Sequence, residues 1–299
     1  MTAAPVVAPP VDVTSRPRGA RRFNLGSLPT HIVIVALMII WLIPTIGLLV
    51  NSFRSQQDAI TTGWWTALFP PSNLSTDNYA YVLAQNGLGA AFVNSLFITI
   101  PATIIPIFVA AFAAYAFSWM RFPGRDVLFV IVVGLLVVPL QSTFIPILGL
   151  YKNFGLNGQF LAVWLAHTGY GLPFAVFVLR NFMGELPKEV FESASIDGAG
   201  HATRFFRLAL PMSIPAVAAL AIFQFLFVWN DLLVALIYIG SNVTNQPLTQ
   251  NLAGLVSSFG NGANYLAAAA FIAMALPLVV FALLQRYFVR GLTGGAVKG

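Results

Sequence analysis

The chain has 299 residues, of which 58% are hydrophobic and only 8% are charged, and its mean hydropathy is +0.83. Soluble domains contain about a quarter charged residues, so this composition excludes an ordinary soluble protein and predicts an integral membrane protein. The net charge of +6 fits basic cytoplasmic loops better than nucleic-acid binding, and the absence of cysteine excludes disulfides, thiolate metal sites and cysteine nucleophiles.

Residues 1–30 are rich in Pro and Ala and then in Arg, which predicts a disordered cytoplasmic tail rather than a cleaved signal peptide. The domain that follows, 31–289, contains six windows apolar enough to cross a bilayer, which takes about 20 residues of helix. The prediction is an all-α membrane protein with these six transmembrane helices: 31–53, 89–118, 127–148, 159–180, 212–238 and 264–289. Residues 290–299 are expected to form a cytoplasmic C-terminal tail.

The basic residues predict the orientation of the six spans. Of the 15 Lys and Arg residues, all except Arg54 and Lys152 fall on one side of a six-span arrangement. Because cytoplasmic loops carry the excess of basic residues, both termini are expected in the cytoplasm of a bacterial-type plasma membrane.

Few ionisable groups lie within the predicted spans. Asp231 in "FVWNDLLVAL" is either a boundary residue that reaches water or, with Asn230, part of a polar substrate path. His167 is interpreted as a structural histidine between helices. One Asp and one His on different spans do not suggest a proton relay, and the chain shows no phosphate loop, metal pattern or serine elbow. The energy for uphill transport would therefore come through a partner.

A polar loop, 181–211, interrupts the apolar sequence between the fourth and fifth spans. In "GELPKEVFESASIDGAG", Pro187 suits a first helical turn, Lys188 to Ile196 are compatible with a helix, and Gly198 suits a left-handed C-cap. Val190, Phe191 and Ala194 would form an apolar face that so short a helix cannot bury alone. The loop is thus either a docking element for another protein or an interfacial helix lying on lipid.

The same loop closely resembles the EAA loop of ABC-importer permeases, whose usual form is E-A-A-x-x-D-G-A-x(8)-I-x-L-P. The matching residues are Glu192, Ser193, Ala194, Asp197, Gly198, Ala199, Leu208, Leu210 and Pro211, with Ser193 where Ala is usual and Leu208 where Ile is usual. The resemblance implies a MetI-like permease fold. It also implies that this loop forms the coupling helix held by a separate ATPase subunit, with Phe191 and Phe205 as apolar anchors.

The C-terminal "VRGLTGGAVKG" is similar to the tail of maltose-type sugar permeases, in the partner that lacks the large extra outer domain. In that family the tail reaches the ATPase subunits, which implies such a role for Gly294, Gly295 and Lys298; a frayed solvent tail is the alternative. "FVWNDLL" is similar to the fifth span of the same permeases. The resemblance covers residues 30–299.

The resemblance implies a carbohydrate permease of an ATP-driven importer that works by alternating access, not an enzyme. The implied partners are a second homologous permease in a heterodimer, two copies of an ATPase that uses ATP and Mg, an extracytoplasmic sugar-binding protein and the lipid bilayer. This chain itself is expected to bind no cofactor, metal or nucleic acid. Candidate residues for the substrate path are Tyr170, Phe174, Asn230 and Asp231, although aromatic packing between helices would also explain the first two.

Other functions stay open at this stage. An ABC permease for a peptide, amino acid, polyol or glycerol phosphate would share the EAA loop. A secondary transporter would normally show paired broken helices and clusters of ionisable residues inside the membrane. A membrane scaffold without transport activity would show no ligand-stimulated ATP hydrolysis with any partner.

Overall fold

The computed structural model describes residues 28–68, 74–84, 87–258 and 262–294, and within these ranges all regular structure is helical. The chain divides into two compact units, 1–46 and 47–299, with the boundary inside the first described helix, α1 (Leu28–Asn51). The predicted tail 1–30 lies outside the described residues except for its last three, which already belong to α1. The functional features discussed below all belong to the second unit.

Among the described residues, four helices are long and apolar enough to cross a membrane: α1, α4 (Leu88–Trp119), α7 (Phe160–Gly184) and the 264–283 part of α14 (Ala263–Gly294). Two bent pairs raise this number to as many as six. The first pair is α5 (Arg125–Gly134) with the 3₁₀ turn η3 (Leu135–Val137), followed by α6 (Leu140–Asn153). The second runs over 201–212 and then α11 (Ile214–Trp229).

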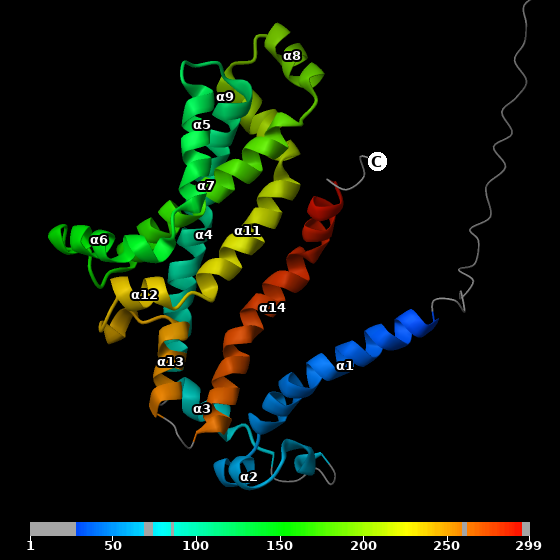
Figure 1. Cartoon of the computed structure of the whole chain (residues 1–299), viewed down its shortest axis with the longest axis vertical. Coiled ribbons are helices and arrows are strands. Elements are labelled where there is room, and N and C mark those ends of the chain that lie inside the picture. Colours follow the sequence, from blue (N-terminus) through cyan, green and yellow to red (C-terminus); the bar gives the residue numbers. More distant parts are fainter. Residues whose placement is uncertain (1–27, 69–73, 85–86, 259–261, 295–299) are drawn as a thin grey trace, which may run out of the picture. The chain divides into compact units, whose positions relative to one another are not determined.

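Helices α4, α7, α11 and α14 form the bundle of the second unit, with α4 against both α7 and α11 (Figure 1). Small residues allow α4 and α7 to approach closely, because Ala110, Ala114 and Ala175 are almost fully buried between them. One end of the unit carries α8 (Lys188–Ile196); the opposite end carries α3 (Asp77–Ala84) and α13 (Leu248–Ser258) (Figure 1).

A buried arginine organises the connection between α1 and α3, which includes α2 (Gln56–Thr61) and the 3₁₀ turn η2 (Trp64–Ala67). Arg54 is 3% exposed, and its guanidinium donates to Asn51 Oδ1 (2.9 Å), to the Asp58 carbonyl (2.8 Å) and to Thr62. Asn78 donates to the Arg54 carbonyl and accepts from Asn264 of α14. These bonds compensate the cost of burying the charge and fix the connection to the start of α14.

Two of the six predicted spans contain a break in the helix. The segment predicted as 127–148 bends by 100° around Pro139, which lacks the N–H that would continue the helix. The segment predicted as 212–238 is interrupted after Trp229, and α12 (Leu233–Tyr238) begins separately. There the Asp231 carboxylate accepts the Val234 N–H at 2.9 Å, which favours a new helix start over continuation.

The C-terminal residues differ partly from the expected tail. Helix α14 continues through 290–293 to Gly294, the first of two glycines that disfavour further helix. Gly295 and Lys298, two of the three tail residues predicted to reach the ATPase, lie outside the described residues, so that prediction stays open.

Candidate functional site

The polar loop 181–211 folds locally as its sequence predicts. Helix α8 follows Pro187, and Gly198 has a φ of 77°, so the predicted left-handed C-cap is confirmed. The N–H groups of Gly198 and Ala199 donate to the carbonyls of Ser195 (3.1 Å) and Ala194 (2.9 Å), the two bonds of a Schellman motif. The helix therefore ends at a fixed residue, and the chain turns sharply there.

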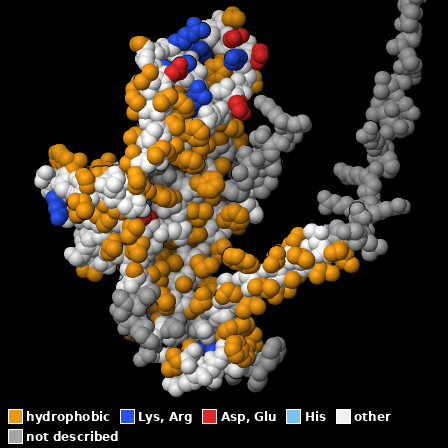
Figure 2. All heavy atoms as spheres, in the orientation of Figure 1, with side chains coloured by type: hydrophobic (Ala, Val, Ile, Leu, Met, Phe, Trp, Pro, Cys, Tyr) orange, Lys and Arg blue, Asp and Glu red, His pale blue; other side chains and the backbone are white. Residues whose placement is uncertain are grey.

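The loop presents a polar surface at its end of the unit. Figure 2 shows acidic and basic side chains gathered over the region of α8 and its neighbours. Ile196, the last residue of α8, has 87% of its surface exposed. Of the residues predicted to contact an ATPase, Glu192, Ser193, Asp197, Gly198 and Pro211 are exposed, whereas Ala194, Ala199 and Leu210 are partly buried.

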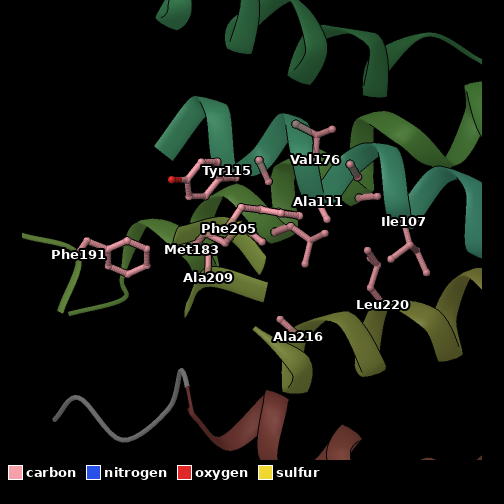
Figure 3. Packing of buried hydrophobic residues seen from close by; sticks show 14 residues of the cluster. Ile107, Ala111, Tyr115, Val176, Met183, Phe191, Phe205, Ala209, Ala216 and Leu220 are labelled. Atoms are coloured by element: carbon pink, nitrogen blue, oxygen red, sulfur yellow. The ribbon is translucent and has the colours of Figure 1, made fainter. Parts of the chain in front are cut away.

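The two predicted aromatic anchors face the chain's own core. Phe191 is 2% exposed and stacks on Trp119 with ring centroids 3.8 Å apart, while Phe205 is 3% exposed and stacks on Phe112 at 4.6 Å. Figure 3 shows Phe191 and Phe205 with the other buried residues of their hydrophobic cluster. The expectation that Phe191 belongs to an unburied apolar face is therefore wrong. Its aromatic partner lies in α4, far away in sequence, and Val190 and Ile196 are the apolar side chains left exposed on α8.

The second half of the loop leads into the bundle through irregular helix. After α9 (His201–Arg204) the backbone forms a π-helical turn, η4 (Phe205–Ala209), then the short α10 (Leu210–Met212). The axis then bends by 70° before α11. π-Helical turns are frequent at functional sites, and this one separates helices α8 and α9 of the loop from the bundle helix α11.

A cavity of about 520 Å³ lies beside α7 and α11, bordered by η3 and α6. Tyr170 and Phe174, both predicted for a substrate path, line it. Its polar lining groups are Thr143, Tyr170 and Gln224, with the Tyr170 hydroxyl within 2.9 Å of the hydroxyls of Thr143 and Tyr238. Sequence reasoning missed Gln224, a lone polar residue in "AIFQFLF" that could have been recognised by its position within an apolar span.

Asn230 and Asp231, the other two predicted path residues, are not among the residues that line this cavity. The Asp231 carboxylate instead lies 3.8 Å from Nε2 of His167, which is 1% exposed, and Thr249 donates to the Asp231 carbonyl at 2.6 Å. Sequence reasoning placed His167 and Asp231 on different spans and did not pair them. Among the described residues, no group of three or more His, Asp or Glu side chains is arranged to hold a metal ion.

Gly171 leaves room for the Gln224 amide where α7 meets α11 beside the cavity. A Cβ at this position would lie 2.6 Å from Gln224 Oε1, and Gln224 also donates to the Ala102 carbonyl of α4 at 3.2 Å. The Gly171→Ala variant is expected to displace the Gln224 amide and break its bond to the Ala102 carbonyl, which destabilises the protein by about 0.5–1.5 kcal/mol. Thermal unfolding in detergent measures the loss.

The matched control is Gly169→Ala on the same helix, because a Cβ there meets no atom within 4 Å. Equal melting temperatures for the two variants would contradict the assignment of Gly171 as a packing glycine.

Comparison with protein families identifies the chain. Residues 102–294 match the family described as binding-protein-dependent transport system inner membrane component. The chain belongs to this family. It is therefore a permease subunit of an ABC importer and not an enzyme, and the family's fold is the all-α permease fold that the EAA-like loop implied.

Relatives of this permease are named for the uptake of sugars and osmoprotectants. It is 53% identical over 274 residues to the osmoprotective compounds uptake permease GgtD of Synechocystis, covering 91% of this chain and 92% of the relative. It is 52% identical to the alpha-glucoside permease AglG of Rhizobium meliloti, covering 79% of this chain but 63% of that longer relative. The arabinooligosaccharide permease AraQ of Halalkalibacterium halodurans is 33% identical, covering 86% of this chain and 91% of AraQ.

A solved structure shows the same fold. A chain of a bacterial ABC transporter involved in import of the acidic polysaccharide alginate superposes with a TM-score of 0.73 and 19% identity, covering 89% of the permease and 99% of that chain. At this identity the likeness concerns the fold alone.

Proposed function

We propose that this permease imports a sugar or a small neutral glycoside, driven by ATP hydrolysis on a separate subunit. The proposal rests on one observation: the solutes for which the relatives are named suit the residues that line the cavity. Relatives more than 50% identical are named for alpha-glucosides and for osmoprotective compounds. The described residues lining the cavity include hydroxyls, an amide and aromatic rings but no charged side chain, a set that suits a neutral polyhydroxy solute.

The proposed assembly is a heterodimer with a homologous permease, two ATPase subunits that use ATP and Mg, and an extracytoplasmic sugar-binding protein. Dependence on a binding protein follows from the family, and the other subunits are inferred from the EAA-like loop. Both termini would be cytoplasmic, because Lys and Arg concentrate on that side of the predicted topology. The exposed part of the loop 181–211 would then lie on the cytoplasmic side of the membrane, where ATP is available.

In the proposed cycle, ATP closes the ATPase dimer and moves the two permease loops, and the bundle opens outward to receive solute from the binding protein. Hydrolysis resets the complex. The loaded binding protein and ATP must each favour one conformation by differential affinity, since a ligand with equal affinity for both states shifts nothing.

The test uses the complex purified through an N-terminal tag on this chain and reconstituted into liposomes with its binding protein. Sucrose and trehalose serve as radiolabelled probes, since both are α-glucosides and both protect cells against osmotic stress; glutamate and a dipeptide are the controls. We expect ATP- and Mg-dependent uptake of at least one disaccharide and of neither control. Uptake of a control solute instead would contradict the sugar assignment, and uptake driven by an ion gradient without ATP would contradict the importer.

A further inference from the structure

One face of α4 carries three aromatic residues, Phe112, Tyr115 and Trp119, spaced by three and four residues so that they lie in one stripe along the helix. Phe112 is partly exposed, Tyr115 is buried, and Trp119 stands at the end of α4 nearest the loop. All three residues contact the loop 181–211, although Phe112 stays 38% exposed.

The loop lies along the stripe in three matched contacts. Phe191 stacks on Trp119 with an interplanar angle of 14°, His201 Nδ1 lies 3.2 Å from the Tyr115 hydroxyl, and the Phe205 ring lies parallel to Phe112 within 25°. The loop is also tied to itself, because Arg204 donates to Ser195 Oγ at 2.7 Å and so joins α9 to α8. These contacts make α8 and α9 one body that packs on α4.

Trp119 joins that body to a third element. Its indole Nε1 donates to the Met183 carbonyl at 3.0 Å, and the adjacent Ser118 hydroxyl donates to the Arg180 carbonyl at 3.1 Å. Met183 lies in the last turn of α7, where carbonyls lack partners within the helix. One side chain thus contacts α8 through its ring face and α7 through its N–H while belonging to α4.

The covalent route from α8 to α11 is less direct. It passes the turn at Asp197–Gly200, the π-helical turn η4 and the 70° bend before α11. Displacement of α8 along this route can be absorbed by changes at each irregular point, whereas the stacked rings transmit it through a packed contact.

We propose that Trp119 is a positioning residue for energy coupling: held between Phe191 and the Met183 carbonyl, it transmits movement of α8 to α4 and to α7, and α7 lines the cavity. This inference rests on the proposed function, because it presupposes that an ATPase moves α8. According to this inference, movement of α8 reaches α4 and α7 before it reaches α11.

The test compares three variants in the reconstituted complex, measuring sucrose or trehalose uptake and ATP hydrolysis together. Trp119→Leu is expected to lower the amount of sugar moved per ATP about tenfold, within the usual range of coupling between sites. Trp119→Phe, which keeps an aromatic ring for the stacking but loses the N–H and part of the ring surface, is expected to restore most of it. Phe191→Leu removes the stacking from the other side and should reproduce the Trp119→Leu defect, which keeps the test decisive if Trp119→Leu fails to assemble.

Trp164→Leu is the matched control. Trp164 likewise joins α7 and α4 through its indole N–H, but in the opposite direction: it belongs to α7 and donates to the Phe97 carbonyl of α4 at 3.0 Å, away from the loop. It should leave sugar moved per ATP unchanged even if it lowers the melting temperature. Equal defects in Trp119→Leu and Trp164→Leu, or a normal ratio in both Trp119→Leu and Phe191→Leu, would overturn the role of Trp119 while the importer stands. A wild-type complex that moves neither sugar with ATP would overturn the proposed function together with this inference.

Discussion

Replacing Gly198 with valine (Gly198→Val) is expected to lower ATP-driven uptake at least about tenfold without removing the permease from the membrane. The φ of 77° at Gly198 is unfavourable for residues with a Cβ by about 1–2 kcal/mol, and β-branching adds to that cost. No atom lies within 4 Å of a Cβ built there, so the penalty comes from the backbone and not from a clash. The Schellman turn would open, and α8 would lose its fixed angle. Initial uptake rates, normalised to the amount of permease in the membrane, measure the effect.

Gly200→Ala is the control for Gly198→Val. Gly200 is two residues away, has a φ of −68° and also has open space around a built Cβ. An L-residue adopts this conformation without strain, so uptake should stay near the wild-type rate. Normal uptake by Gly198→Val, or an equal loss in both variants, would show that the left-handed turn is not needed for coupling.

Charge reversal at Glu192 (Glu192→Lys) is expected to abolish uptake by weakening the hold of the ATPase. Glu192 is exposed on α8, and no hydrogen bond or ion pair joins its side chain to another described residue, so the variant should fold and insert normally. Reversing a charge at a protein interface places like charges together and typically costs several kcal/mol of binding free energy. This cost is comparable to the whole binding free energy of a weak, transient complex. Co-purification of the ATPase with the tagged permease measures the loss.

Asp126→Lys separates a local effect from a change in total charge. Asp126 is 80% exposed, lies on the same predicted side of the membrane, and changes the net charge by the same amount, but it belongs to α5 and not to the loop. Its contact with the half-buried Arg125 lies at the surface and contributes little stability. If Asp126→Lys lost the ATPase as fully as Glu192→Lys, the effect would not be specific to α8.

The local structure of the loop could be predicted because its determinants are adjacent in sequence. Pro187 marks the start of α8 and Gly198 its end, and both act through their own backbone preferences. The burial of Phe191 could not be predicted in this way, because its partner Trp119 lies on a helix whose pairing with α8 depends on the whole bundle. A short helix with one aromatic residue gives the same pattern whether that residue meets its own chain or another protein.

The six apolar windows were predicted from composition, but their shape depends on single residues within them. Apolar length alone does not separate a straight span from a bent one, and Pro139 and Asp231 determine where the third and fifth windows break. The same limit applies to the cavity. Tyr170 and Phe174, predicted as candidates for the substrate path, line the cavity, whereas Gln224 was not predicted and reaches it because Gly171 leaves space for its amide.

Site-directed cross-linking at Ile196 tests most directly whether the turn after α8 is the contact to an ATPase. The chain has no cysteine, so Ile196→Cys gives a single attachment point for a photoreactive label at a side chain that is 87% exposed. Ile145→Cys on α6 is the control, since Ile145 is 82% exposed but belongs to another surface. In the intact complex, we expect the label at 196 to join the permease to the ATP-hydrolysing subunit and the label at 145 not to do so. Equal yields at the two positions, or no adduct at 196 in a complex that still hydrolyses ATP, would contradict the account.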